Sequence, residues 1–283
     1  MNQIEIPRGL DKGFKPAKEY EKMFISPNWR LKAAMRPLKI EDDFGFNVIG
    51  RGFIFPKHQE AIEANGGAVR DFWYDWVVIL TESFNHIDQI KKNCKKPILC
   101  EKPLIIKKED MDFLDGVPEL FTCLQLRYLD LNFEKSEFDK INIDIRTKRD
   151  KEYFESWKGN PEKSGGILLN IAIHYFDLLF HHFGFPEKME VKCCKLTDRF
   201  AEGMFMSKTF QADWRFEMGE DIKEKRLFQV NKKKYDLSTK ENLYVPLYRD
   251  LLADKGISWL DVKKLYQLIF HLQENVGENY TNF

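Results

Sequence analysis

The chain has 283 residues, 43% of them hydrophobic, and 45 basic and 45 acidic side chains that give a formal net charge of zero. This length can bury the cores of two modest domains, and the balanced charge argues against nucleic acid as the main partner. No apolar run reaches the roughly 18 residues that cross a membrane, and five cysteines without a Cys-x-x-Cys pair or a secretory signal indicate reduced thiols in a cytoplasmic protein without a zinc site.

The first 45 residues lack a clear apolar period, so we expect an N-terminal extension. A strand, a turn and a helix follow: Phe46 to Gly50 is apolar, Gly50-Arg-Gly52 is the turn, and a helix is predicted over 56–65. This order lets the backbone approach a pyrophosphate, whose charge faces the free amides of the helix N-terminus. A glycine pair before a helix is as often only a tight turn, and Phe55 replaces the third glycine of the fingerprint.

Strands and helices then alternate. We predict strands over 76–81, 97–100 and 120–125 and helices over 85–93 and 108–114. Such alternation is typical of a parallel sheet covered on both faces, so residues 46–125 form a shortened Rossmann-like, dinucleotide-binding α/β domain. Ligands of these sheets lie at the carboxyl ends of the strands, where Lys102 is expected.

The pattern changes after residue 125. Strands are predicted over 140–146, 188–197, 204–211 and 212–217, with a hairpin over 226–237 and helices over 246–252 and 258–275. Residues 126–283 are therefore interpreted as an α+β domain with a mostly antiparallel open sheet, which would hold the substrate and support oligomerisation.

A helix between the glycine pair Gly165-Gly166 and Gly184 carries the most informative pattern. It is apolar except for one polar stripe, and a buried polar group costs a few kcal/mol unless it is paired. The stripe is a candidate active-site wall, although a lone His on a buried helix is more often a hydrogen-bonded core residue. Its members are Asn170, His174, Asp177 and His181.

Several strings, in the right order, resemble the glucose-fructose oxidoreductase and inositol dehydrogenase (Gfo/Idh/MocA) family over roughly residues 46–272. They are Val48 to Ile54 with Lys57-His58, Glu101-Lys-Pro103, and the helix from Asn170 to Asp177. Four others are most similar to the branch that oxidises the 3-hydroxyl of UDP-N-acetylglucosamine or its uronic acid in surface-polysaccharide synthesis. They are Leu124 to Arg127, Ser156 to Gly159, Lys163 to Gly166, and Asn170 to His174.

The resemblance implies an NAD-dependent sugar-nucleotide dehydrogenase, with NADP as the alternative cofactor, a UDP-sugar substrate and a homodimer or homotetramer. It implies His174 as the general base, Lys102 as the stabiliser of the developing oxyanion and Asp177 as the residue that orients them, roles that suit the chemistry. The implied cofactor-binding residues are Gly50, Gly52, Phe53, Ile54, Thr81, Asn85, His86 and Glu101. The implied substrate-binding residues are Arg127, Trp157, Lys163, Ser164 and Asn170.

The sequence departs from the family at several places, of which the interval before residues 76–81 is the largest; Glu82 also replaces the Pro after Thr81, and a His near Leu124 to Arg127 is absent. Relatives carry a second and a third strand with their helices before the strand that matches residues 76–81, and here only residues 66–75 fill that interval. A parallel crossover needs a dozen or more residues, so the adenosine-binding half is expected to be incomplete, with either a stub strand near 68–72 or a rearranged sheet. Asp71 is the one nearby acidic residue for the ribose. The alternative function is therefore a non-catalytic descendant that binds a sugar nucleotide or acts as a scaffold.

Overall fold

The computed structural model describes residues 44–281, and residues 44–283 form one compact unit. The predicted N-terminal extension lies outside the described residues, apart from its last two, which begin the first strand. In the part of the chain that the structure describes, no helix is long and apolar enough to span a membrane.

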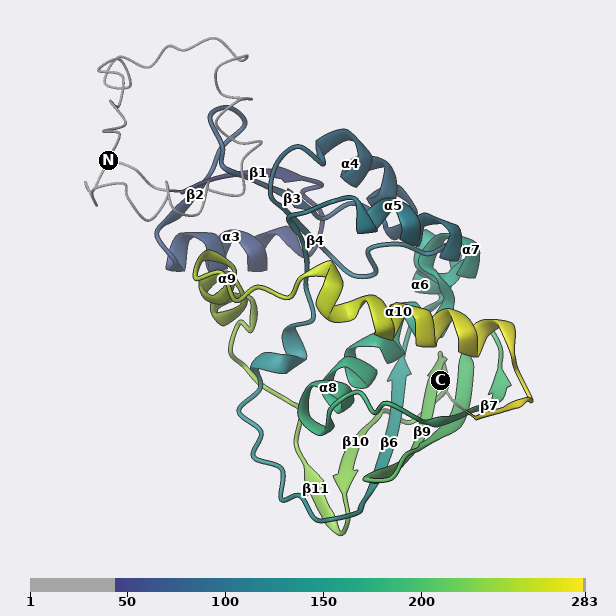
Figure 1. The fold of residues 1–283 in the computed structure, drawn as a ribbon. Helices are drawn as coiled ribbons and strands as arrows, with labels where there is room; N and C mark the ends of the chain where they lie inside the picture. The colour runs from purple at the N-terminus through teal and green to yellow at the C-terminus, as the bar shows by residue number, and fades with distance from the viewer. Residues whose placement is uncertain (1–43, 282–283) are drawn as a thin grey trace. The chain divides into compact units, whose positions relative to one another are not determined.

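The first sheet is parallel and has five strands in the order β2-β1-β3-β4-β5 (Figure 1). The strands are β1 (Phe44–Ile49), β2 (Gly67–Val69), β3 (Trp76–Ile79), β4 (Ile98–Cys100) and β5 (Leu120–Thr122). Its connections contain α3 (Phe55–Ala64), η2 (Ser83–Asn85), α4 (His86–Asn93), η3 (Lys108–Asp110) and α5 (Met111–Asp115). The predicted Rossmann-like sheet is confirmed, and every residue of β3, β4 and β5 is buried, as expected for a parallel sheet between helices.

A stub strand, one of the two expected alternatives, joins the shortened part of this sheet. The strand β2 pairs with the first half of β1, from Phe44 to Phe46, whereas β3 pairs with the second half, from Phe46 to Ile49. Phe46 of β1 pairs with the last residue of β2 on one side and with the first residue of β3 on the other. The connection therefore does not have to run back along the length of the strands, and the six residues 70–75 are enough to join β2 to β3. These residues cross β1 at Gly45, where an added Cβ would lie 2.7 Å from the main-chain oxygen of Trp73.

The second sheet has seven strands in the order β11-β10-β6-β9-β8-β7-β12, with one parallel pair, β6 with β9. Its strands are β6 (Asp139–Lys148), β7 (Glu190–Leu196), β8 (Phe200–Met206), β9 (Phe210–Gly219), β10 (Lys225–Val230), β11 (Lys233–Tyr235) and β12 (Asn279–Thr281). The predicted mostly antiparallel sheet is confirmed. The boundaries predicted for β8 and β9 were wrong, because the turn between them lies at residues 207–209, inside the predicted strand 204–211, and β12 was not predicted.

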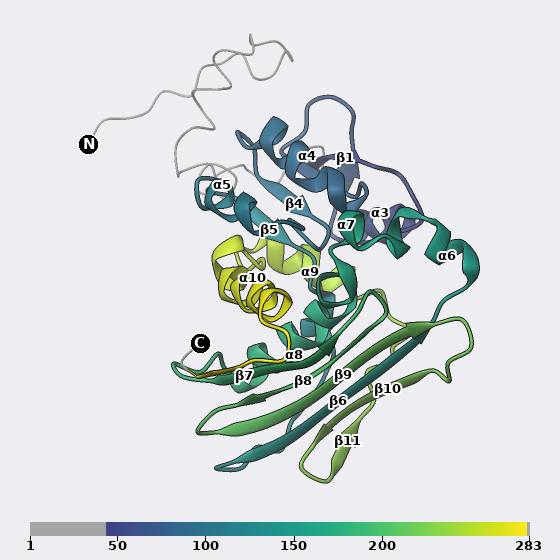
Figure 2. The ribbon, with the colours of Figure 1, turned by 90° about the vertical axis from the view of Figure 1, so that its right-hand side faces the viewer.

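Apart from β6, the segment between β5 and β7 is mostly helical. Its helical elements are η4 (Gln125–Tyr128), α6 (Lys151–Glu155), η5 (Trp157–Gly159), α7 (Pro161–Ser164), the π-helical segment η6 (Leu168–Ala172) and α8 (Ile173–Phe183). The helix predicted between the glycine pair and Gly184 is present, with its first part in the π-helical form of η6, and Gly165 and Gly166, whose φ angles are 80° and 72°, separate it from α7. Figure 2 shows α8 and the C-terminal helices on one face of the second sheet, and no described helix on the other.

Two C-terminal helices connect the sheets. The helix α9 (Tyr244–Leu252) packs against α3, and α10 (Trp259–Glu274) contacts α5 and β5 on one side and α8 and β7 on the other. A capping box formed by Ser258 and Asp261 starts α10, as the sequence predicts. The assignment of residues 126–283 to a separate second domain remains a prediction, since both helices also belong to the packing around the first sheet.

Candidate active site

Lys102 and the polar face of the long helical segment meet at the carboxyl end of the parallel sheet. Lys102 follows β4, and its Nζ donates to the main-chain oxygen of Asn170 over 2.6 Å and lies 3.5 Å from Asn170 Oδ1. Asn170 lies in the π-helical segment, and its Nδ2 donates to the hydroxyl of Tyr153 at 2.8 Å. The structure thus brings together two residues that the sequence places 68 positions apart.

His174 lies one turn after Asn170 and is only partly buried as a residue. Its Nδ1 is nevertheless shielded from solvent and has no hydrogen-bond partner. Burial, together with the positive charge of Lys102, lowers the pKa of His174 to about 3. The imidazole is therefore neutral at physiological pH and keeps a lone pair that can accept a proton.

Lys102 has an altered proton affinity as well. Burial lowers the pKa of Lys102 to about 8, the nearby Glu101 carboxylate opposes this change, and Lys158 and Arg149 add to it. A lysine with a pKa close to neutral can be charged when it stabilises an oxyanion and can still exchange its proton.

Asp177, predicted to orient the catalytic pair, binds Arg127 instead. Arg127 donates from Nε to Asp177 Oδ2 over 2.8 Å and from Nη2 to Oδ1 over 2.5 Å, and the Asp177 side chain is 2% exposed. Burial raises the pKa of Asp177 and Arg127 opposes that rise. The predicted stripe thus has two parts: Asn170 and His174 accompany Lys102, and Asp177 forms a buried ion pair one turn further on. Arg127, predicted to bind substrate, is one half of that pair.

Glu101, predicted to bind the cofactor, has protein partners. Its Oε1 accepts from the Tyr244 hydroxyl at 2.6 Å and lies 3.2 Å from His58 Nε2, and its Oε2 accepts from the Lys102 amide at 3.1 Å. Burial alone would raise the pKa of Glu101, but His58, Tyr244 and Lys102 together lower it to about 2. The ionised carboxylate therefore holds the Lys102 loop against α3 and α9.

The other ring nitrogen of His58 lies 2.9 Å from the Tyr248 hydroxyl, so α9 contributes two tyrosines to this buried group. Among the described residues, ligand atoms of His58, Glu101 and Cys123 lie within 4.8 Å of one another, a spacing that a metal ion could bridge. The His58 and Glu101 atoms are already bonded to each other and to the tyrosines, so hydrogen bonding accounts for the group without a metal. The sequence shows His58 in the Lys57-His58 string, whereas no local pattern indicates Tyr244 or Tyr248.

His86 is also an internal residue. It is 1% exposed, and its ring nitrogens lie 2.7 Å from the Pro103 oxygen and 2.9 Å from the Thr81 oxygen. The neighbouring Asn85 donates to the Glu82 carboxylate at 3.1 Å. These contacts join the end of β3 to the loop after Lys102, so we now assign His86 to positioning this loop, in place of the predicted cofactor contact.

The Gly-rich turn retains features that suit a dinucleotide phosphate. Gly50 has a φ of 91° and passes the main chain of Leu80 so closely that a Cβ would lie 2.8 Å from it, while Gly52 faces open space. No side chain caps the N-terminus of α3 after Ile54, but the Phe55 and Lys57 amides donate to the main-chain oxygens of Gly52 and Ile54, and Pro56 has no amide hydrogen. The Thr81 hydroxyl at the end of β3 is buried without a hydrogen-bond partner. These residues fit the phosphate and nicotinamide part of NAD.

The adenosine part fits less well. The strand β2 has three residues, and Asp71, which follows it, is bound to Arg51 of the Gly-rich turn at 2.6 Å. Arg51 and Asp71 are both largely exposed. A ribose would have to share this carboxylate with Arg51.

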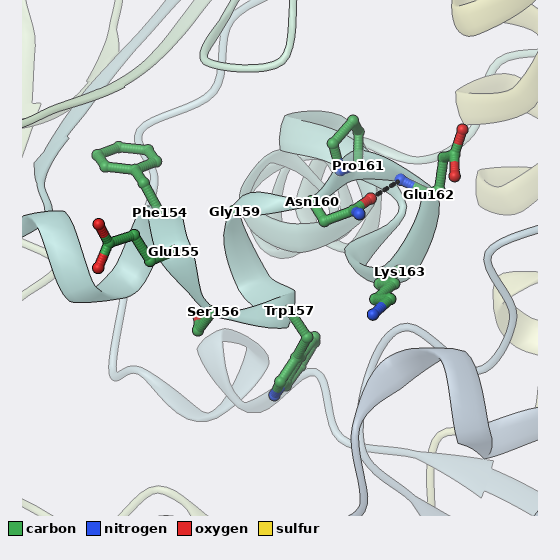
Figure 3. A pocket seen from close by; sticks show the side chains of 9 residues that line it. All are labelled: Phe154, Glu155, Ser156, Trp157, Gly159, Asn160, Pro161, Glu162 and Lys163. Atoms are coloured by element: carbon green, nitrogen blue, oxygen red, sulfur yellow. Dashed lines mark hydrogen bonds between the residues drawn. The ribbon is translucent and has the colours of Figure 1, made fainter.

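Two of the predicted substrate-binding residues, Trp157 and Lys163, line a hollow of about 520 Å³ between residues 154 and 163. Figure 3 shows Trp157 and Lys163 pointing to the same side of it. Aromatic rings surround this side: Phe84 packs edge-on against Trp157 at 6.2 Å, and Lys158 Nζ lies 4.0 Å from the ring centre of Phe53.

Ser164 does not face this hollow. Its residue is 2% exposed, and its hydroxyl donates to the Asn160 oxygen at 2.9 Å and accepts from the Gly166 amide at 3.3 Å. Ser164 therefore stabilises the turn, in contrast to the substrate contact that the resemblance implies.

Comparison with known proteins agrees with this geometry. Residues 139–220 match the family described as the oxidoreductase family, C-terminal alpha/beta domain (GFO_IDH_MocA_C). The fold is similar to that of the WlbA (WbpB) dehydrogenase from Thermus thermophilus in complex with NAD and UDP-GlcNAcA, with 22% identity, a TM-score of 0.70, and coverage of 81% of this chain and 94% of that one.

The WlbA dehydrogenase from Bordetella pertussis, in complex with NADH and UDP-GlcNAcA, shares 14% identity at a TM-score of 0.67, over 87% of this chain and 99% of that one. A putative myo-inositol dehydrogenase from Sinorhizobium meliloti 1021 shares 17% identity at 0.64, over 85% and 100%. The resemblance predicted from the sequence is thereby confirmed, and the chain has the two-domain α/β fold of the Gfo/Idh/MocA oxidoreductases.

Proposed function

We propose that this protein is an NAD-dependent dehydrogenase that oxidises a hydroxyl of a sugar nucleotide, the 3-hydroxyl of a UDP-N-acetylglucosamine-type sugar. The observation that carries the proposal is the approach of Lys102 to Asn170 beside the unpartnered Nδ1 of His174. A scaffold has no use for a lysine of lowered pKa next to a neutral histidine, whereas alcohol oxidation needs both a hydrogen-bond donor and a proton acceptor.

In this proposal, a bound nicotinamide cofactor would supply the hydride acceptor at the carboxyl end of the parallel sheet. Gly50, Gly52, Phe53 and Ile54 would hold its phosphates, and Thr81 offers an unused hydroxyl. His174 accepts the proton of the substrate hydroxyl, and Lys102 donates a hydrogen bond to the same oxygen while negative charge develops there. Asn170 fixes the position of Lys102, and the Arg127–Asp177 pair fixes the helix that carries His174.

The substrate, the pathway and the assembly follow from the family branch. Two neighbours of similar fold are dehydrogenases solved with UDP-GlcNAcA, and the hollow formed by residues 154–163 has room for part of such a sugar nucleotide. We further propose a cytoplasmic enzyme of surface-polysaccharide synthesis that works as a homodimer or homotetramer. All five cysteines are free thiols, which suits a reducing compartment.

The test begins with the purified full-length protein, to which NADH is added while its fluorescence is recorded. Uptake of NADH, followed by NAD reduction with a UDP-sugar, is the expected result. The variant His174→Asn should lose about 10²- to 10⁴-fold in turnover while it still takes up NADH, because only the proton acceptor is removed. If millimolar NADH does not bind to the folded protein, the enzyme proposal is wrong and a sugar-nucleotide-binding or scaffold protein remains.

A further inference from the structure

Two cations near Lys102, Arg149 and Lys158, have no carboxylate partner among the residues that the structure describes. We propose that Arg149 and Lys158 form a subsite for an anionic group of the substrate, either a carboxylate on the sugar ring or its diphosphate. This inference rests on the dehydrogenase function proposed above and specifies which part of the substrate these residues recognise.

Arg149 is connected to the active site through two side chains. It follows β6, and its guanidinium lies over the ring of Tyr153, 4.9 Å from the ring centre. The Tyr153 hydroxyl accepts a hydrogen bond from Asn170, and Asn170 in turn accepts one from Lys102. An anion bound by Arg149 would therefore lie on the same side of the helix as the proposed reaction centre.

The hydrogen-bonding capacity of Arg149 is largely unused. Its Nε is buried and has no hydrogen-bond partner, and its Nη1 reaches only the Lys148 main-chain oxygen at 3.4 Å. Among the described residues 149–163, Lys151 forms an ion pair with Glu155, whereas Arg149 and Lys158 have no carboxylate partner. A buried guanidinium nitrogen without an acceptor is costly, so an external acceptor would stabilise this arrangement.

The cations also repel one another. Burial lowers the pKa of Lys158, and Arg149 lowers it further. Lys158 and Arg149 both lower the pKa of Lys102, which also lies near the Glu101 carboxylate and the neutral His174. Glu101 is the carboxylate that acts on Lys102, and a bound anion would reduce the repulsion that Arg149 and Lys158 exert on it.

The hollow between residues 154 and 163, which Lys163, Glu155 and Glu162 line, lies in the chain segment that also contains Lys158. Lys158 lies between the rings of Phe53 and Trp157, at 4.0 and 5.9 Å from their centres, and Lys163 Nζ lies 5.6 Å from the Phe84 ring centre. Cationic groups held on aromatic faces are already oriented, so an anion does not have to order them on binding.

The experiment compares three probes, UDP, UDP-N-acetylglucosamine and its uronic acid, by calorimetric titration of the full-length protein without cofactor. Arg149→Met is the main variant, and Lys158→Met is the second in case the first does not fold. Lys148→Met, which removes an exposed cation from the neighbouring position, is the matched control. We expect the main variants to weaken binding about 10- to 100-fold, the loss typical of a charge-assisted hydrogen bond, and the control to bind like the wild type.

The probes distinguish the two sources of the anion. A loss confined to the uronic acid assigns the subsite to the sugar carboxylate, and an equal loss for all three probes assigns it to the diphosphate. Wild-type affinity in folded Arg149→Met and Lys158→Met would overturn the subsite but leave the proposed function in place. If none of the probes binds the wild type, the proposed function itself is wrong, and the subsite with it.

Discussion

The ammonium group of Lys102 donates to the main-chain oxygen of Asn170 across 2.6 Å, from the end of a parallel strand to a π-helical turn. This contact fixes the lysine next to His174, and it leads to a prediction about the pH dependence of turnover. With His174 neutral down to its pKa of about 3 and Lys102 losing its proton near pH 8, kcat/KM should stay level through neutral pH and fall above about pH 8. Initial rates between pH 5 and 10 provide the measurement.

The same profile tests the division of roles. If Lys102 were the proton acceptor, kcat/KM would rise through pH 8, because the lysine would have to be neutral. Lys102→Met should reduce kcat about 10²- to 10³-fold and abolish the alkaline limb, while a thermal melt like that of the wild type shows that the fold is retained.

The buried ion pair of Arg127 and Asp177 leads to a prediction about stability. Removal of one member leaves an uncompensated charge, so Arg127→Met should lower the free energy of unfolding at pH 7 by about 3–5 kcal/mol. The pKa of Asp177, already raised by burial, rises further in this variant. The folded state then binds a proton more tightly than the unfolded state, so the loss should shrink as the pH is lowered.

Denaturant titrations of Arg127→Met at pH 7 and pH 5 measure this difference. The double variant Arg127→Met/Asp177→Leu is the control, since it removes both charges and should recover much of the loss. Equal destabilisation at both pH values would show that lost packing, not the buried charge, causes the effect.

The Glu101 carboxylate predicts a specific sensitivity to acid. Its pKa is lowered from 4.5 to about 2, so its contribution to stability is complete above about pH 4.5 and is lost as the pH falls toward 2. Tyr244→Phe removes one hydrogen bond that keeps the pKa low, and it should reduce stability at pH 7 by about 1 kcal/mol and shift acid unfolding to higher pH. Acid titrations followed by circular dichroism would contradict this interpretation if Tyr244→Phe and the wild type unfolded at the same pH.

Gly45 should be intolerant of any side chain, since an added Cβ would lie 2.7 Å from the oxygen of Trp73 and 2.8 Å from the Cα of Tyr74. Gly45→Ala should therefore destabilise the protein by about 1–3 kcal/mol. Gly116→Ala is the matched control, because its nearest neighbour would lie at an ordinary 3.4 Å. Chemical denaturation of the two variants gives the comparison, and similar midpoints would show that the crossing can move.

The periodic parts of the fold could be predicted from the sequence, and the long-range pairings could not. Strands β3 and β4 are short apolar runs between turn signals, and α10 carries its own capping box. The helix predicted over the polar stripe is present, but its π-helical first part was not predicted, and this part changes the angular spacing that an ideal helix gives to Asn170 and Asp177.

The same limit applies to the candidate site. The sequence motifs around Lys102 and His174 identify these two residues as candidates. The partners of Asp177 and Glu101 lie 50 and 143 residues away along the chain. No local pattern encodes such distances. For this reason the resemblance implied a cofactor contact for Glu101, where the structure shows a carboxylate bound to His58 and Tyr244.

The offset of β2 and β3 along β1 also affects how the protein behaves at high concentration. The outermost strand on that side has three residues, and the charged Arg70 and Asp71 follow it. So short an edge presents few free main-chain groups to a strand of another molecule. The shortened sheet is thereby protected against edge-to-edge aggregation on the side where it lost its outer strand.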